Sequence, residues 1–364
     1  MNNEDIKYWV ALNSVAGLGP VTFRQLLKCF GSAKRAWKAN AGELKKFNFK
    51  AKLTENFLQA QKTVDLTTTM ERLGRLGIKV ITISSPDYPS LLRQTYDPPF
   101  LLYVRGEITP QDELAIAFVG SRKMTRYGLE VTENLVQNLV AHGLTIVSGL
   151  AFGVDVASHQ AALDAGGRVI AVLASGVDII TPTSNTFLAE RILGEGRGAI
   201  ISEHPLGTVP QRYFFPVRNR IISGLSLGTV VIEATEKSGT AHTARAALEQ
   251  GREVFAVPGS IFSPLSIGTH NLIKAGAKLV NSVGDILEEL NLEGRSLNLE
   301  AREVVPESPE EGKILEIIGD DEVHVDEIIQ KSGLSTSQVA ATLTMMEMKG
   351  KVKNLGGQTY RIAR

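Results

Sequence analysis

The sequence has 364 residues, more than one average domain contains, which predicts two or three domains. A hydrophobic fraction of 43% with 21% charged residues is typical of a globular protein, and equal numbers of acidic and basic residues argue against strong, indiscriminate polyanion binding. The single cysteine, Cys29, excludes an intrachain disulfide and a cysteine-based zinc site.

Neither a membrane segment nor a secretion signal is expected. No run of eighteen apolar residues occurs, and the first ten residues lack the basic-then-apolar pattern of a signal peptide, so we expect a cytoplasmic protein. The neutral total charge hides an uneven distribution. Residues 1–77 have 13 Lys and Arg against 6 Asp and Glu, whereas residues 285–311 have 2 against 9. A local site for nucleic-acid phosphate at the basic end therefore stays open.

Residues 1–77 are expected to form a small helical domain of the SAM or helix-hairpin-helix type. Leu26, Leu27 and Phe30 follow helical spacing, and Gly31-Ser32 indicates the end of one helix and the start of another. The turn Gly17-Leu18-Gly19 resembles a helix-hairpin-helix, which aims backbone N–H groups at a phosphate without reading sequence. A plain turn between two helices explains it equally well.

Residues 78–290 are expected to form an α/β core, Rossmann-like, with a doubly wound and mostly parallel sheet. Near-continuous apolar runs predict parallel strands covered on both faces, at 78–83, 115–119, 144–147, 169–173, 199–202, 229–233 and 254–257. Helices are expected between them, for example at 127–142, 155–165 and 240–250. Alternation of strand and helix over about 200 residues is typical of this fold class.

The remaining residues predict an acidic linker at 291–311 and a winged-helix domain at 312–364. In the latter, helices are expected around Ile314–Ile318, at 325–331 and at 335–349, followed by a hairpin with Gly356-Gly357 at its tip. Lys349, Lys351 and Lys353 gather near this hairpin. Such a surface suits contact with a protein, or an auxiliary grip on duplex phosphate.

Three glycine-rich loops follow predicted strands and form the first candidate site. They contain Gly120, Ser121 and Arg122; Ser148, Gly149 and Gly153; and Gly259. In open α/β sheets, ligands lie beyond the carboxyl ends of the strands, and glycine lets the backbone approach an anion there. Arg122 adds a forked phosphate donor. Alternatively, the glycines only serve tight turns. Neither a dinucleotide-binding GxGxxG motif nor a Walker A motif occurs, so no cofactor is expected.

The segment Arg212–Arg220 is the second candidate, because it places three arginines and three aromatic residues within nine positions. Guanidinium groups bind phosphates, whereas ring faces and amides contact unpaired bases. We therefore expect DNA contacts from Arg212, Phe215, Arg218, Asn219 and Arg220. The alternative is that the rings are buried in the core and that Arg218 or Arg220 pairs with Glu203 or Glu233.

A third segment extends from Glu233 to Thr240. Ser238, Gly239 and Thr240 can cap the helix that follows and hold a phosphate. Glu233 is a candidate general base or, more simply, the partner of an arginine. Asp155 and His159 are a candidate catalytic pair, although a local hydrogen bond is the expected reading. No nucleophile elbow or HExxH motif is present, so neither catalysis nor a bound metal is expected.

In chain order, five motifs resemble the DprA/Smf family of DNA-processing proteins, from about residue 6 to the C-terminus. They are VGSRKMTRYG (119–128), SGLAFGVDVASH (148–159), FPVRNRIISGLS (215–226), EATEKSGTAHTA (233–244) and EVFAVPGS (253–260). The resemblance implies a Rossmann-like core that forms a homodimer and binds single-stranded DNA, with weaker binding of double-stranded DNA. It also implies loading of the RecA recombinase during natural transformation or homologous recombination.

The resemblance also assigns roles to residues. Arg122 matches the arginine that the family places on DNA phosphate, Arg212 lies where members tend to carry a basic residue, and Arg218–Arg220 match the family motif directly. Two patterns depart from the family. The YPxxN motif appears without its tyrosine at Thr181–Asn185, and His270 replaces an asparagine. We therefore assign no DNA contact to Thr183 or His270.

Two other functions fit parts of the sequence. The third segment is similar to Rossmann-type nucleotide-processing hydrolases, such as phosphoribohydrolases, but these carry a PGGxGT loop before the catalytic glutamate, whereas Glu233 precedes Ser-Gly-Thr. A transcriptional regulator would need basic residues on its recognition helix, yet residues 335–349 are mostly Thr, Ala and Met with one terminal lysine. A DNA-binding protein without enzymatic activity is therefore the favoured hypothesis.

Overall fold

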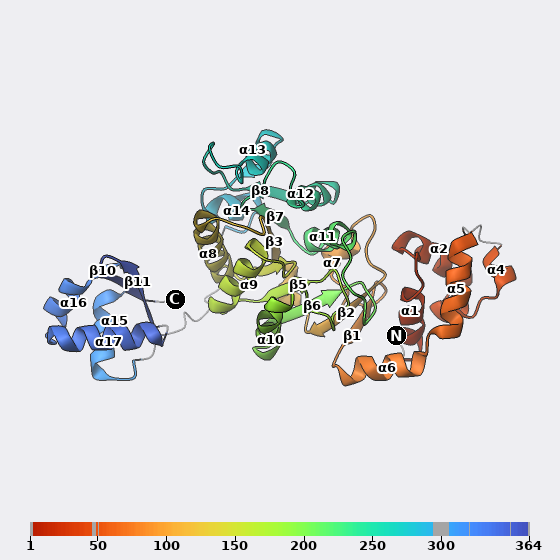
Figure 1. Cartoon of the computed structure of the whole chain (residues 1–364), viewed down its shortest axis with the longest axis horizontal. Helices are drawn as coiled ribbons and strands as arrows, with labels where there is room; N and C mark the ends of the chain where they lie inside the picture. Colours follow the sequence, from red (N-terminus) through yellow and green to blue (C-terminus); the bar gives the residue numbers. More distant parts are fainter. Residues whose placement is uncertain are drawn as a thin grey trace. The chain divides into compact units, whose positions relative to one another are not determined.

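A computed structural model describes residues 3–45, 49, 51–293, 306–319, 321–349 and 351–362, and the chain divides into two compact units (Figure 1). Residues 1–296 form the first unit and residues 297–364 the second. Of the expected linker at 291–311, residues 294–305 lie outside the described residues, and the boundaries at 77 and 290 stay predictions. Within the described ranges, every helix is too short or not apolar enough to cross a lipid bilayer.

The first part of the larger unit is helical and packs on the start of the sheet. Its described helices are α1 (Asn3–Asn13), α2 (Pro20–Phe30), α3 (Ala33–Trp37), α4 (Ala41–Lys45), α5 (Ala51–Thr63) and α6 (Leu66–Arg75). The expected helix end and restart is confirmed: Gly31 ends α2 at a φ of 72°, and the Ser32 hydroxyl accepts the Arg35 amide at 3.2 Å and caps α3. Phe23 of α2 stacks on Phe100, with ring centroids 3.8 Å apart.

A nine-stranded sheet forms the centre of this unit, in the order β1-β2-β6-β5-β4-β3-β7-β8-β9. The strands are β1 (Lys79–Thr82), β2 (Leu101–Gly106), β3 (Ala115–Val119), β4 (Thr145–Ser148), β5 (Val169–Val172), β6 (Gly198–Ser202), β7 (Gly228–Val231), β8 (Glu253–Ala256) and β9 (Lys278–Leu279). Pairing is parallel from β6 to β9 and antiparallel only at β1–β2 and β2–β6. The predicted mostly parallel sheet is therefore confirmed, while β2 and β9 were not predicted.

Helices cover both faces of the sheet, as expected for a doubly wound fold. One face packs against α8 (Arg126–Ala141), α9 (Val154–Asp164), α10 (Thr186–Gly194) and α14 (Val283–Glu289), and the other against α7 (Ser90–Arg93), α11 (Phe214–Gly224) and α12 (Thr240–Glu249). The remaining elements are α13 (Ile267–Lys274) and the short helices η1 (Pro110–Glu113) and η2 (Thr183–Asn185). Along β3, Ile116 and Phe118 belong to the first core and Ala117 to the second, because successive side chains point to opposite faces.

The direction of winding reverses between β3 and β7. From β3 the chain runs through β4 and β5 to β6 on one side, and it then returns to place β7, β8 and β9 on the other. Crevices at such a reversal, beyond the carboxyl ends of the strands, are the usual ligand sites of open α/β sheets. The predicted glycine-rich loop at 120–122 follows β3, and the predicted segment at 233–240 follows β7. Both therefore lie where the winding reverses.

The smaller unit has the expected winged-helix elements. These are α15 (Pro309–Ile318), β10 (Val323–His324), α16 (Val325–Ser332), α17 (Thr336–Met348), β11 (Val352–Gly356) and β12 (Thr359–Ile362). Ser335 begins α17 through a capping box with Gln338. The smaller unit has a hydrophobic core of its own between the three helices, in which Ile314, Ile328 and Leu343 are buried.

Candidate nucleic-acid interface

Two glycines bring the loops after β3 and β4 into direct contact. A Cβ added to Gly120 would lie 2.5 Å from a methyl group of Val154. Gly153 has a φ of 74°, and a Cβ there would overlap the backbone of Ser121 and Arg122. The Val154 amide also donates to the Ser121 carbonyl at 3.3 Å. The two loops therefore pack directly against each other, and the Arg122 side chain beside this contact is exposed.

Arg122 is the point at which two sequence motifs meet. Its guanidinium carbon lies 5.4 Å from the ring centroid of Phe215, which is in the first turn of α11. A guanidinium over an aromatic face is held by the ring quadrupole while its N–H donors stay available at the edge. The structure thus places an exposed, oriented cation at the switch point of the sheet, where the winding reverses between β3 and β7. Phe215 supports this cation, and its ring is half-buried.

Arg218, in contrast, is buried beneath the loop after β4. Its Nη1 donates to the carbonyl oxygens of Gly149, at 2.8 Å, and Val172, while its Nε donates to Asn219 Oδ1 at 3.1 Å. Burial lowers the pKa of Arg218 to about 10, although the nearby Asp155 carboxylate opposes the shift. Arg218 and Asn219 therefore contact each other and the protein interior.

The loop after β4 is stabilised by bonds within the protein. Ser148 Oγ donates to the Phe118 carbonyl at 2.7 Å, and the Gly149 and Ala151 amides donate to Asp155 Oδ2 at 3.1 and 3.3 Å. Burial raises the pKa of Asp155, and the charge of Arg218 and these amides lower it. Leu150 has a φ of 56°, and its carbonyl accepts Asn185 Nδ2 at 2.8 Å. The structure therefore directs the amide of Gly149 to Asp155.

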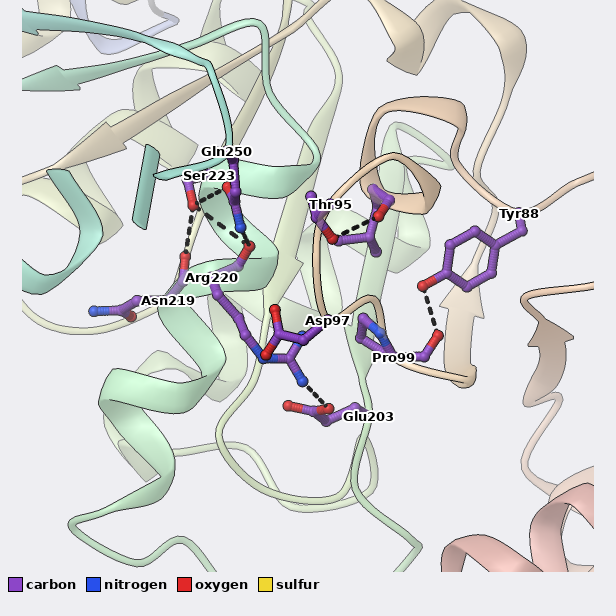
Figure 2. A network of polar contacts seen from close by, with 10 residues as sticks. Tyr88, Thr95, Asp97, Pro99, Glu203, Asn219, Arg220, Ser223 and Gln250 are labelled. Carbon is purple, nitrogen blue, oxygen red and sulfur yellow. Dashed lines mark hydrogen bonds and ion pairs between the residues drawn. The ribbon is translucent and has the colours of Figure 1, made fainter. Parts of the chain in front are cut away.

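Arg220 and Arg212 lie in different environments although both are in the same segment. Arg220 Nη2 donates to Glu203 Oε2 at 2.6 Å, and its Nε lies 3.2 Å from Asp97 Oδ2 (Figure 2). The alternative that Arg220 pairs with Glu203 is thus confirmed. Arg212 is exposed in the loop before α11. Only Arg122 and Arg212, among the arginines predicted to contact DNA, present an exposed side chain.

The loops after β7 and β8 lie on the other side of the point where the winding reverses. The Thr240 amide donates to Ser238 Oγ at 3.2 Å at the start of α12, where Gly239 is exposed. A side chain on Gly259 would collide with Ser266, and the Gly259 amide lies 3.4 Å from His270 Nε2. Tyr127 Oη donates to the Pro258 carbonyl at 2.6 Å and so connects this side to α8.

Two expectations about acidic and basic pairs are wrong. Glu233 pairs with none of the arginines that the structure describes: its carboxylate accepts the Thr125 amide at 2.8 Å and the Thr125 hydroxyl at 2.6 Å, at the N-terminus of α8. His159 forms no hydrogen bond with Asp155, because Asp155 bonds the backbone of its own loop. Both ring nitrogens of His159 are buried without a hydrogen-bond partner in the described part of the chain.

Sequence reasoning missed two exposed rings near the same edge. Phe152 follows β4 and Phe187 lies in the first turn of α10 after β5, and their exposed fractions are 51% and 74%. Tyr213, from the predicted segment Arg212–Arg220, precedes α11 and is 62% exposed. Aromatic residues in loops that follow strands were the available signal. Within the described ranges, no group of three or more His, Cys, Asp or Glu side chains could hold a metal ion.

Two protein-family models match the chain. Residues 79–291 match the model described as DNA recombination-mediator protein A, and residues 299–358 match the DprA winged helix domain. Protein Smf of Synechocystis is 32% identical over 400 residues, which cover 99% of this chain and 100% of that protein. DNA processing protein DprA of Bacillus subtilis is 48% identical over 215 residues, covering 59% of this chain and 72% of that protein.

Two solved structures are similar in fold. DNA processing protein A from Streptococcus pneumoniae superimposes with a TM-score of 0.68 at 34% identity, covering 78% of this chain and 97% of that chain. DNA processing protein A from Helicobacter pylori, described for its single-stranded DNA binding mode, superimposes with a TM-score of 0.53 at 28% identity. That match covers 59% of this chain and 97% of the Helicobacter chain.

Proposed function

Because this chain belongs to the DNA recombination-mediator protein A family, we propose that it binds single-stranded DNA at the carboxyl edge of its sheet. The observation that carries the proposal is Arg122, an exposed guanidinium held over Phe215 at the switch point. Arg212, exposed in the loop before α11, is the second proposed phosphate contact. Both residues can donate two parallel hydrogen bonds to a phosphate.

The other site residues take supporting roles in this proposal. Gly120, Gly149 and Gly153 allow the loops to pack closely, while Arg218 and Asn219 stabilise them from below. The loops after β7 and β8 provide Ser238, Gly239 and Thr240, at the N-terminus of α12, together with Gly259. A helix N-terminus favours a phosphate through its positive dipole end and its free N–H groups.

We further propose little sequence preference and a preference for single strands. The exposed rings of Phe152, Phe187 and Tyr213 can stack on unpaired bases, and stacking tolerates any base. In a duplex these base faces are already stacked. The only ionisable side chain in α17, the helix that a regulator would use to read duplex sequence, is the acidic Glu347.

The remaining proposals follow the family. We propose that the protein acts without catalysis in the cytoplasm, that two copies associate, and that bound strands are delivered to the RecA recombinase. Association of two copies is supported by Ile261 and Phe262, which are 79% and 90% exposed after β8, and by β9 at the edge of the sheet. Exposed apolar side chains and open strand edges are both features of surfaces that bury another chain.

Titration with oligonucleotides tests the central proposal. Labelled single strands of several base compositions, and a duplex of the same length, are titrated by fluorescence anisotropy at several salt concentrations. We expect tighter binding of all the single strands and an affinity that falls as salt rises, because neutralised phosphates release counterions. Preference for the duplex, or for one sequence, would contradict the proposal.

A further inference from the structure

Arg220, unlike the exposed Arg122, is held in a polar network. Figure 2 shows its guanidinium directed at Asp97 and Glu203, and its side chain is only 12% exposed. Asp97 lies in the loop before β2 and Glu203 directly follows β6. Burial raises the pKa of Glu203, and the charge of Arg220 lowers it in opposition. Through Asp97 and Glu203, Arg220 thus joins α11 to two loops of the sheet.

The backbone of the same residue is held from a second direction. Gln250 Nε2, at the C-terminal end of α12, donates to the Arg220 carbonyl at 2.8 Å. The Ser223 hydroxyl, one turn further along α11, donates to Gln250 Oε1 at 2.7 Å (Figure 2). Contacts on two sides restrict both rotation and sliding of α11 against the sheet.

The network continues into the N-terminal helices. Asn13, the last residue of α1, donates from Nδ2 to the Glu203 carbonyl at 3.2 Å. Tyr103 of β2 in turn donates from its hydroxyl to Asn13 Oδ1 at 3.1 Å. The position of Glu203 therefore depends on α1 and β2 as well as on Arg220.

The loop that presents Arg212 begins and ends at this network. Its first residue is Glu203, and its far end runs into α11, the helix that carries Arg220. The His204 ring lies 4.2 Å from the ring of Phe214, the first residue of α11, and Phe214 in turn lies 4.5 Å from the Tyr213 ring. A shift of the Arg220–Glu203 pair would thus move both ends of the loop.

We propose that Arg220 is a positioning residue: through Glu203 it sets the place of Arg212 and of Phe215 beneath Arg122, and it contacts no DNA phosphate itself. This inference rests on the proposed single-strand binding. Through Asn13, the N-terminal helices would then influence the site without contacting DNA themselves.

The test compares Arg220→Gln, Glu203→Gln and the double variant with the parent by single-strand titration at several salt concentrations. Arg122→Ala removes a proposed direct contact and serves as the comparison. Arg245 is an exposed arginine paired with Glu249 on α12, so Arg245→Gln controls for the loss of one positive charge. Circular dichroism and urea unfolding establish that each variant is folded under the assay conditions.

We expect Arg220→Gln and Glu203→Gln each to weaken binding about tenfold, with an unchanged salt slope and no further loss in the double variant. The direction of the affinity change in Glu203→Gln is decisive. If Glu203 did not position other residues, removing its negative charge should strengthen binding to DNA. Arg122→Ala should instead reduce the salt slope by about 0.7, the value for one phosphate contact in a single strand.

Other outcomes separate the two proposals. A reduced slope in Arg220→Gln, with Glu203→Gln harmless, would make Arg220 a phosphate contact. Parent-like binding by both variants, with Arg122→Ala weakened, would remove the positioning role and leave the single-strand site intact. Parent-like binding by Arg122→Ala and Arg212→Ala would remove the site itself. If Arg220→Gln does not fold, Glu203→Gln decides alone, since glutamine keeps the size of glutamate: weaker binding at an unchanged slope supports the inference, and parent-like or tighter binding overturns it.

Discussion

The guanidinium of Arg218 fills the space that a side chain on Gly149 would need. A Cβ added to Gly149 would collide with both terminal nitrogens of Arg218, while the Gly149 carbonyl accepts one of them at 2.8 Å. The Gly149 amide is bonded to Asp155, whose carboxylate lies close enough to Arg218 to affect its pKa. A motif arginine and a motif glycine are therefore one packed unit below the surface.

Arg218→Gln and Gly149→Ala are expected to destabilise the fold. The first leaves Asp155 without its buried cationic neighbour and leaves the Gly149 and Val172 carbonyls short of a donor, which costs on the order of 3 kcal/mol. The second forces the guanidinium from its place. Urea unfolding followed by circular dichroism measures both, with Arg245→Gln as a surface control that should lose less than about 1 kcal/mol. An Arg218→Gln variant as stable as the parent would refute this account of the buried unit.

Arg122→Ala and Arg212→Ala are expected to weaken single-strand binding without loss of stability, because both side chains are exposed. Each should lower the slope of log affinity against log salt by about 0.7, equally for all base sequences. Anisotropy titrations across a salt series provide the measurement. Parent-like slopes in both variants would place the DNA elsewhere on the protein.

The contrast between Arg122 and Arg218 shows where prediction from sequence ended. Apolar runs alternating with helical patterns predicted the sheet, because parallel strands covered on both faces leave that pattern. Burial of Arg218 depends on Gly149, 69 positions earlier in the chain, and no local pattern encodes such a contact. Strand β2, which pairs antiparallel with β1 and β6, was missed because only the short α7 separates it from β1, so it interrupts the alternation of strand and helix. Strand β9 was missed because it has only two residues. The partner of Glu233 was likewise set by the fold, which places Thr125 beside it.

Glu233→Gln is expected to destabilise α8 rather than to remove an activity. The carboxylate accepts two hydrogen bonds from Thr125, and the uncharged amide can accept fewer and weaker ones, a loss of about 1–2 kcal/mol. Incubation of the parent protein with nucleoside monophosphates or oligonucleotides, followed by chromatography, should show no products. Hydrolysis that disappears in Glu233→Gln would instead support a Rossmann-type hydrolase.

Buried His159 is expected to make stability depend on pH. Burial lowers the pKa of His159 to about 3, opposed in part by the Ile170 backbone, and the positive charge of Arg218 lowers it further. The unfolded chain, with a pKa near 6.5, binds the proton more readily. Stability is therefore full above about pH 6.5 and is lost as the pH falls towards 3, by about 1.4 kcal/mol per pH unit.

The matching variant is His159→Leu, which has similar volume and no titrating group. Urea unfolding between pH 7 and pH 4 should show a shallower loss than in the parent, with some slope remaining from His204, whose pKa burial lowers to about 4. His242→Leu, at an exposed position on α12, should keep the parent slope. An unchanged slope in His159→Leu would contradict the assignment.

In the smaller unit, two of the three lysines near the hairpin, Lys349 and Lys351, are paired with acids. Lys349 Nζ lies 2.5 Å from Glu307 Oε2, and Lys351 Nζ lies 2.6 Å from Glu311 Oε2. Hydrogen bonds from Lys349, the first cause, and from Lys351, whose Nζ also lies 2.9 Å from Glu307 Oε1, lower the pKa of Glu307 to about 2. Lysines neutralised in this way release few counterions on meeting a phosphate, so this surface should add little to single-strand affinity.

A chain of residues 1–296 is therefore expected to fold and to bind single-stranded DNA within about twofold of the full-length protein. Leu290 and Leu292 pack on the sheet core, so the cut belongs after them, and residues 297–364 have a core of their own. Of the proposed contacts, Arg122 and Arg212 both lie in the larger unit, and the salt slope, which counts phosphate contacts, should stay unchanged. Anisotropy titrations of both pieces and of the full chain, with single strands and duplex, provide the measurement. If residues 1–296 lose only duplex binding, the smaller unit has an auxiliary role in binding duplex DNA. Single-strand binding confined to residues 297–364 would show that the site is not on the sheet edge.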